Sequence, residues 1–171
     1  MGLTKIASKV FLPRQKELER HYINPEKIQH HVLKHLVEKG CETEYGRTHI
    51  FSGINNYSDF TKNVPINTYE ELKNDIDRMR HGEQDVLWPG LIKWFAKSSG
   101  TTNDKSKFIP VSNAGLHRIH YKGGADVVAL YLRNNPQSRL FDGKSLILGG
   151  SHSPNYNVEG SLVGDLSAIL I

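Results

Sequence analysis

The sequence predicts an α/β fold in which a helical first half precedes strands and one long helix. In the first 90 residues, apolar side chains recur at helical spacing between capping residues. After residue 90, short apolar runs bounded by polar residues and glycines are typical of strands. The length of 171 residues allows one domain, residues 1–171. Hydrophobic residues make up 37% of the chain and charged residues 23%, which excludes an intrinsically disordered chain.

One helix is predicted over residues 25–40. Asn24 and Pro25 are typical of an N-cap followed by the first residue of a helix. Apolar side chains then recur at helical spacing from Ile28 to Leu36. Gly40 is a typical stop, so the helix is expected to end there.

Two shorter helices are predicted before residue 81. Ser58-Asp59 opens the first, which ends at Val64-Pro65 because the residue before a proline disfavours helical backbone. Thr68 and Glu71 have the spacing of a capping box. The capping box predicts the start of a second helix that runs to about Met79.

A turn over residues 85–90, with Trp88 as a packing anchor, leads into a predicted pair of strands. The first strand covers 92–97 and the second covers 107–111. Pro110 has no N–H to donate to a neighbouring strand, so the second strand is expected at an edge of the sheet.

Beyond the strand pair, Ser112 is predicted to cap a long helix over 113–133. The helix is expected to end at 134–136, where two asparagines precede a proline. Residues 144–148 (Lys-Ser-Leu-Ile-Leu) predict a third strand, which closes on Gly149-Gly150.

The net charge of +4 is unevenly distributed. Residues 91–124 hold six basic side chains against one acidic side chain, Asp104. A local excess of this kind favours a polyanion nearby, although a solvated surface is the plain alternative. A basic nucleic-acid-binding module is therefore an alternative function. The chain has no helix-turn-helix or zinc-finger pattern, so we expect no nucleic acid among its partners.

The segment between the two predicted strands has residue types that suit a phosphate group. Gly100 permits backbone angles that let successive amides approach an anion, and lysine side chains at 105 and 107 can supply positive charge. Hydroxyl groups that can donate to phosphate oxygens come from Ser98, Ser99, Thr101 and Thr102.

Two familiar phosphate loops do not match this segment. Walker spacing counted from Gly100 puts Lys105 where the second glycine belongs. A kinase glycine-rich loop needs three spaced glycines, and this segment has one. From composition alone, a polar hairpin loop without a ligand remains the alternative.

Residues 95–102 (Phe-Ala-Lys-Ser-Ser-Gly-Thr-Thr), followed by Lys107-x-Ile-Pro110, resemble the phosphate-binding motif of the auxin-responsive (Gretchen Hagen type) acyl-acid amido synthetases, which belong to the adenylate-forming superfamily. The resemblance extends over most of residues 10–150. It includes four upstream landmarks in the same order: Thr43–Arg47, Val64-Pro65, Tyr69–Leu72 and Val86–Gly90.

The resemblance implies a fold and a reaction. The chain would form part of the large N-terminal domain of an adenylate-forming enzyme, with residues 1–90 mainly helical and residues 91–171 carrying the phosphate-binding loop. ATP and a small carboxylic acid would form an acyl-adenylate, which an amino acid would convert to an amide. Magnesium ions (Mg2+) would bridge the phosphates, and the helix over 113–133 would wall part of the acyl pocket.

Carried over by position, the resemblance implies which residues bind the nucleotide phosphates. No catalytic residue and no acyl-pocket residue is assigned. Asn103 or Asp104 stands where the family motif often has glycine. The implied phosphate-binding residues are Ser98, Ser99, Gly100, Thr101, Thr102 and Lys107, with Lys105 as an additional candidate.

The later parts of such an enzyme, including its ribose contacts and its mobile carboxyl-terminal domain, find no counterpart among the 171 residues. The apolar stretch Leu166–Ile171 is typical of a buried element, which also predicts a piece of a longer protein. A partial gene product with no activity of its own is therefore a further alternative.

The remaining candidates are weaker. His31 and His35 share one helix face, but no third ligand is evident, so we expect no metal site. Residues 149–152 are expected to form a plain turn. Cys41 is the only cysteine, and the chain has no secretory signal and no apolar run long enough to span a membrane. We therefore expect a cytoplasmic protein without a membrane partner.

Overall fold

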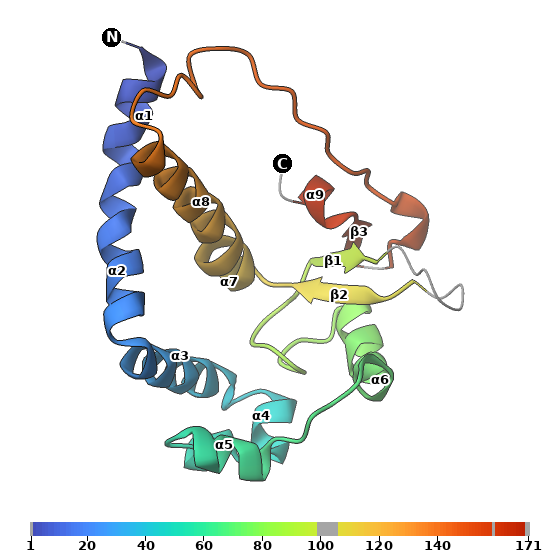
Figure 1. The fold of residues 1–171 in the computed structure, drawn as a ribbon. Helices are drawn as coiled ribbons and strands as arrows, with labels where there is room; N and C mark the ends of the chain where they lie inside the picture. Colours follow the sequence, from blue (N-terminus) through green and yellow to red (C-terminus); the bar gives the residue numbers. More distant parts are fainter. Residues whose placement is uncertain (1, 99–105, 159, 170–171) are drawn as a thin grey trace. The chain divides into compact units, whose positions relative to one another are not determined.

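The computed structural model describes residues 2–98, 106–158 and 160–169 (Figure 1). Contacts between residues divide the chain into two compact units. The first unit joins residues 1–28 with 113–148, and the second joins 29–112 with 149–171. Each unit therefore combines segments that are far apart in the sequence.

The first unit is helical. Its amino-terminal part consists of α1 (Leu3–Phe11), a 3-10 turn (Leu12–Arg14) and α2 (Gln15–Ile23). Its later part is a continuous helical run, as the sequence predicts for 113–133. The run consists of α7 (Asn113–Gly115), a π turn (Leu116–His120) and α8 (Tyr121–Asn134).

Contacts between α8 and the amino-terminal helices hold the first unit together. Arg14 forms an ion pair with Asp126 of α8, and Glu17 pairs with Lys122 at 3.2 Å. Ala129 of the same helix is completely buried. A small side chain at this position lets the helix backbones approach closely, and the carbonyl oxygen of Ala129 accepts a hydrogen bond from Gln15 at 3.3 Å.

The amino-terminal end of α1 is tied to the segment after α8. The buried residue Thr4 donates its backbone N–H to a carboxylate oxygen of Asp142 at 2.9 Å. The Thr4 hydroxyl oxygen accepts from the backbone N–H of Phe141 at 2.9 Å. The first of these bonds satisfies a free N–H of the first helical turn, and the second satisfies the N–H of Phe141. The hydrogen bond from the Thr4 backbone lowers the pKa of Asp142 below its ordinary value.

The predicted strand over 144–148 is wrong. These residues belong to no helix or strand and are exposed. A short apolar run predicts a strand only if a partner strand lies beside it, and no described residue supplies one.

Before its first strand, the described part of the second unit contains most of helix α3 (Pro25–Gly40) and four further helical segments. The capping box is confirmed, because the backbone N–H of Thr68 donates to the Glu71 carboxylate at 2.6 Å. The short helix begins at Tyr57, one residue before the predicted opening at Ser58, and the Asn56 side chain caps it by accepting from the Asp59 N–H at 3.0 Å. The four segments are α4 (Glu44–Thr48), a 3-10 turn (Phe51–Gly53), α5 (Tyr57–Asn63) and α6 (Tyr69–Arg80).

A three-stranded sheet follows, in the order β2-β1-β3. Strand β1 (Trp94–Lys97) pairs antiparallel with β2 (Phe108–Val111) and parallel with β3 (Leu162–Gly164). The predicted strand pair and the edge position of Pro110 are confirmed. The third strand lies at 162–164 instead of 144–148. A 3-10 turn (Pro154–Tyr156) precedes β3, and α9 (Leu166–Ile169) follows it.

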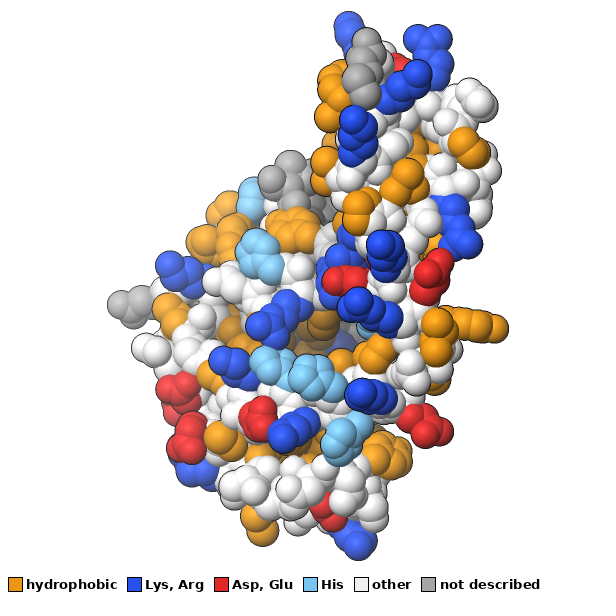
Figure 2. All heavy atoms as spheres, turned by 90° about the vertical axis from the view of Figure 1, so that its left-hand side faces the viewer, with side chains coloured by type: hydrophobic (Ala, Val, Ile, Leu, Met, Phe, Trp, Pro, Cys, Tyr) orange, Lys and Arg blue, Asp and Glu red, His pale blue; other side chains and the backbone are white. Residues whose placement is uncertain are grey.

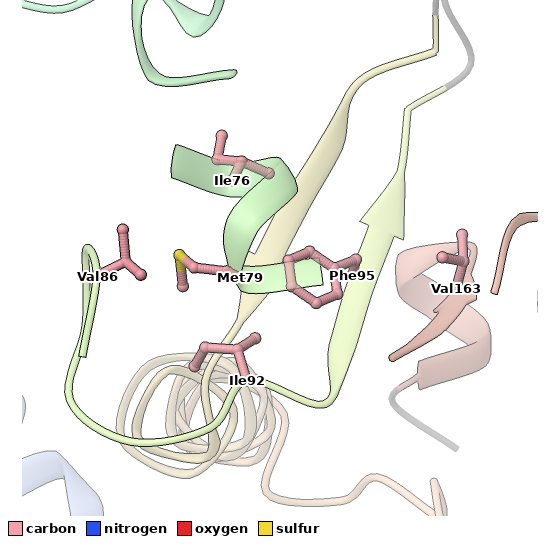
Figure 3. Packing of buried hydrophobic residues seen from close by; sticks show 6 residues of the cluster. All are labelled: Ile76, Met79, Val86, Ile92, Phe95 and Val163. Carbon is pink, nitrogen blue, oxygen red and sulfur yellow. The ribbon is translucent and has the colours of Figure 1, made fainter. Parts of the chain in front are cut away.

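The core of the second unit lies between α6 and the sheet. Ile76 and Met79 of α6 belong to the same buried cluster as Phe95 of β1 and Val163 of β3, and the Met79 side chain points toward Val86 (Figure 3). Phe95 is fully buried, and the predicted anchor Trp88 packs against this cluster while partly exposed. The six buried members are Ile76, Met79, Val86, Ile92, Phe95 and Val163.

The turn before α4 has no room for a side chain at Gly46. The buried hydroxyl of Thr43 accepts from the Gly46 N–H at 2.9 Å and donates to the Gly40 carbonyl at 2.7 Å. A Cβ atom on Gly46 would lie 1.9 Å from that carbonyl oxygen. The glycine in the Thr43–Arg47 landmark is therefore required by a backbone contact.

No helix of the described residues is both long enough and apolar enough to cross a bilayer.

We predict that Gly46→Ala lowers the free energy of unfolding by about 3 kcal/mol, because the added methyl group overlaps the backbone. The matched control is Gly53→Ala, whose Cβ would meet a side-chain carbon at an ordinary 3.5 Å. The control should change the free energy by less than about 1 kcal/mol. Chemical denaturation of both variants measures the difference, and equal midpoints would contradict the packing argument.

We predict that Asp142→Asn destabilises the chain at pH 7 and that this difference shrinks in acid. The folded-state pKa of Asp142 is lowered, so its contribution is present above the unfolded pKa of about 3.9. That contribution is lost as pH falls through the folded pKa. Thermal melting of both proteins between pH 7 and pH 3 measures the effect. A difference that stays constant over this range would refute the role of the charge.

Candidate functional site

The candidate site is the base of the hairpin that joins β1 to β2. Of the predicted phosphate-binding residues, Ser98 and Lys107 lie in the described part of the chain. The structure brings these two together at the base of the hairpin. The other five, Ser99, Gly100, Thr101, Thr102 and Lys105, lie outside the described residues.

Two hydrogen bonds close the base of the hairpin. The backbone N–H of Ser98 donates to the carbonyl oxygen of Lys107 at 2.9 Å. The backbone N–H of Lys107 donates to the Ser98 hydroxyl oxygen at 3.1 Å. Because a hydroxyl group can accept and donate at once, this bond leaves the Ser98 proton available to an oxyanion. The ends of the intervening segment are thus held side by side.

Helix α6 supports the outer edge of this hairpin. The hydroxyl oxygen of Tyr69, the first residue of α6, accepts the backbone N–H of Phe108 at 3.0 Å. The ammonium nitrogen of Lys107 lies 5.2 Å from the centre of the Tyr69 ring. Tyr69 therefore satisfies a free N–H of the edge strand and contacts a predicted phosphate-binding lysine.

Cation–aromatic contacts also surround Phe108 and Tyr156. The guanidinium carbon of Arg80 lies 3.8 Å from the centre of the Phe108 ring, and Arg80 also donates to the Tyr156 carbonyl oxygen at 3.0 Å. The ammonium nitrogen of Lys97 lies 3.7 Å from the centre of the Tyr156 ring. These contacts bring three cationic groups near the ends of the hairpin segment: Arg80, Lys97 and Lys107.

The sequence did not predict the roles of Tyr69, Arg80 and Tyr156. Tyr69 and Arg80 are the first and last residues of α6. The sequence therefore indicated that they lie at the ends of a helix, but it did not indicate that they contact the hairpin. Tyr156 lies in the 3-10 turn before β3, and no local pattern connects it with Lys97.

The site is chemically suited to an oxyanion. Lysine ammonium groups and a hydroxyl proton are the donors that phosphate oxygens accept. Asp77 neutralises part of the charge by pairing with Arg80 at 3.2 Å. The two lysines rest on aromatic rings, from which a long flexible side chain can move toward an anion.

Residues 149–152 and Cys41, which the sequence offered as weaker site candidates, form hydrogen bonds with neighbouring parts of the protein. Residues 149–152 pack against the segment after β3, where Gly150 N–H donates to the Ser167 hydroxyl at 2.8 Å. His152 forms a bridge to Gly164 of β3. The Cys41 thiol, half-buried, donates to the Glu38 carbonyl at 3.1 Å.

Histidine side chains are interspersed with lysine and arginine side chains on the face shown in Figure 2. Among the residues described, no three histidine, cysteine or acidic side chains come together in a way that could hold a metal ion.

The fold indicates a class of protein, because the small mixed sheet and the helices of this chain match part of the fold of solved acyl acid amido synthetases. The structure titled "GH3.15 acyl acid amido synthetase" matches with a TM-score of 0.76 and 27% identity, over 91% of this chain and 28% of that chain. The structure of AtGH3.15 in complex with 2,4-DB matches with a TM-score of 0.72 and 28% identity, over 86% of this chain and 25% of that one.

A model of the GH3 family N-terminal domain matches residues 14–171, and the chain belongs to this family. The resemblance and the α/β fold predicted from the sequence are thereby confirmed.

Curated relatives from Arabidopsis thaliana are amido synthetases or ligases. Indole-3-acetic acid-amido synthetase GH3.15 is 34% identical over 132 residues, which are 76% of this chain and 21% of the relative. The 4-substituted benzoates-glutamate ligase GH3.12 is 32% identical over 108 residues, which are 63% of this chain and 19% of the relative. The chain therefore spans about a fifth of the length of these relatives.

We predict that Tyr69→Phe loosens the base of the hairpin and leaves the ring contacts in place. Loss of the hydroxyl group leaves the Phe108 N–H without its protein acceptor, which costs about 1 kcal/mol. Hydrogen exchange at the Phe108 amide should then quicken by about fivefold. The matched control is Tyr57→Phe, since Tyr57 is 73% exposed on α5. Unchanged exchange at Phe108 in Tyr69→Phe would refute this role.

Proposed function

We propose that this chain supplies the phosphate-binding part of an ATP-dependent acyl-acid amido synthetase, which joins a small carboxylic acid to an amino acid. The observation that carries the proposal is the closed hairpin base, where Ser98 and Lys107 hold the ends of a hydroxyl-rich segment together. Membership of the GH3 family supports the same reaction class.

The proposed reaction has two steps. A carboxylate oxygen of the acid attacks the α-phosphorus of ATP, a new O–P bond forms, and pyrophosphate leaves with the electrons of the broken bond. The amine of the amino acid then attacks the acyl carbon, AMP leaves, and the amine loses a proton. Lysine charge and hydroxyl donors at the hairpin would stabilise the negative charge that develops on pyrophosphate.

The residues present fit a nucleotide phosphate in their donor chemistry. Ser98 has a hydroxyl proton to donate, and Lys97 and Lys107 flank the same segment. Bound Mg2+ would neutralise phosphate charge, and it ordinarily keeps several waters and phosphate oxygens as ligands. Binding of Mg2+ together with ATP therefore does not require a cluster of metal-ligating side chains in the protein. Under the proposal, this chain binds and orients the phosphates.

We predict that the chain binds ATP with Mg2+ and that Ser99→Ala combined with Thr101→Ala weakens this binding at least about tenfold. Each lost hydrogen bond to a charged phosphate contributes about 1.5–3 kcal/mol. Isothermal titration calorimetry on the 171-residue chain measures the affinity. A matched control is Ser58→Ala with Thr61→Ala, which removes two exposed hydroxyl groups from α5.

Equal ATP binding by both double variants would refute the assignment of the hairpin. A second measurement tests the reaction. This chain replaces the matching part of the Arabidopsis GH3.15 enzyme, and carboxylate-dependent exchange of pyrophosphate into ATP is followed. Exchange that is insensitive to Ser99→Ala with Thr101→Ala would also contradict the proposal.

A further inference from the structure

Lys97 is the last residue of β1 and directly precedes Ser98, the first of the predicted phosphate-binding residues. The resemblance to the family motif gave Lys97 no role. Its ammonium nitrogen lies 3.7 Å from the centre of the Tyr156 ring. Among the residues that the structure describes, no carboxylate forms an ion pair with this ammonium group. An aromatic ring is therefore the contact that locates the charge of Lys97.

A ring face holds a lysine differently from a carboxylate. A carboxylate carries a full negative charge, so an ion pair neutralises the ammonium group and competes with a phosphate for it. The negative face of an aromatic ring attracts the ammonium group but adds no net charge. Lys97 is thus held in one place while its positive charge stays available to an incoming anion.

Contacts with three neighbouring elements fix the position of the Tyr156 ring. The Tyr156 carbonyl oxygen accepts from the Arg80 guanidinium group of α6 at 3.0 Å. The side chain of the next residue, Asn157, accepts the backbone N–H of Val163 in β3 at 2.8 Å. The Tyr156 ring lies beside the Phe108 ring of β2, with 6.0 Å between their centres. The ring is therefore held at the end of β1 by α6, β2 and β3.

Arg80 is the third cation near the hairpin, but its charge is already engaged. Its side chain is 11% exposed and pairs with Asp77 at 3.2 Å, and its guanidinium group lies over the Phe108 ring. An anion at the hairpin would therefore meet the ammonium groups of Lys97 and Lys107, whereas Arg80 supports the surrounding structure.

We propose that Lys97 binds a phosphate group of the nucleotide, and that Tyr156 is a positioning residue that holds the Lys97 ammonium group for this contact. The inference rests on the proposed function, because the nucleotide supplies the phosphate. A ring that locates a flexible lysine in advance reduces the conformational freedom that the side chain loses on binding. Tyr156 acts through Lys97 and makes no phosphate contact of its own.

The first measurement is the affinity of the 171-residue chain for ATP with Mg2+, by isothermal titration calorimetry. Lys97→Met should weaken binding about tenfold, because a charged contact with phosphate is lost. Tyr156→Leu should weaken it about threefold, whereas Tyr156→Phe keeps the ring and should bind ATP as the unaltered chain does. Lys97→Met combined with Tyr156→Leu should bind no more weakly than Lys97→Met alone, because the ring acts only through the lysine.

The matched control is Lys62→Met, which removes the same charge from an exposed position on α5. Its affinity for ATP should stay within about twofold of that of the unaltered chain, because a distant exposed charge is screened by salt. Circular dichroism checks that each variant keeps its fold.

A second measurement tests the ring contact without nucleotide. The Lys97 ε-methylene signals should be shifted upfield in the NMR spectrum of the unaltered chain, because the end of this side chain lies over the Tyr156 ring. Tyr156→Phe should keep the shift and Tyr156→Leu should abolish it. An unshifted signal in the unaltered chain would overturn the positioning role, whatever the variants do.

The outcomes separate this inference from the proposed function. If Lys97→Met and Lys62→Met bind ATP equally while Ser99→Ala with Thr101→Ala weakens binding, the assignment of Lys97 is wrong and the proposed function stands. If the Lys97→Met and Tyr156→Leu effects simply add, Tyr156 has a structural role and is no positioning residue. Absence of ATP binding by the unaltered chain would overturn both proposals.

Discussion

The antiparallel pairing of β1 with β2 is the interaction on which the candidate site depends. It places Lys97 opposite Phe108, and one step further the Ser98 backbone and hydroxyl meet Lys107. Because these hydrogen bonds form within the protein, Ser98 and Lys107 are positioned before any ligand arrives. Phe95 of β1 is fully buried in the core, so the same strand that pairs with β2 is packed against the interior of the second unit.

Helix α6 connects stability with the site. Its middle buries Ile76 and Met79 in the core, while its first residue bonds to β2 and its last contacts Phe108. A change in the packing of α6 therefore moves both the core and the surroundings of the hairpin. This coupling gives a physical reason for the spacing between the Tyr69–Leu72 landmark and the phosphate-binding motif, since one helix links the two.

Features encoded within a few neighbouring residues were predictable from the sequence. The capping box at Thr68, the edge position of Pro110 and the strand pair each depend on local backbone chemistry. The position of the third strand was not predictable from the sequence. Residues 144–148 have the stronger apolar pattern, whereas residues 162–164 are the ones that pair with β1. Contacts such as Lys97 with Tyr156 join residues far apart in the chain, and spacing carries no signal for them.

The π turn at Leu116–His120 has a consequence for the helix that contains it. One additional residue in a helical turn offsets the following side chains by about 100° relative to an uninterrupted helix. The helix after this turn carries the buried residues Ala129 and Leu132. Deletion of a single residue within 116–120 would turn the side chains of α7 by about 100° relative to Ala129 and Leu132, so the number of residues in this turn sets the directions in which the two helical segments face.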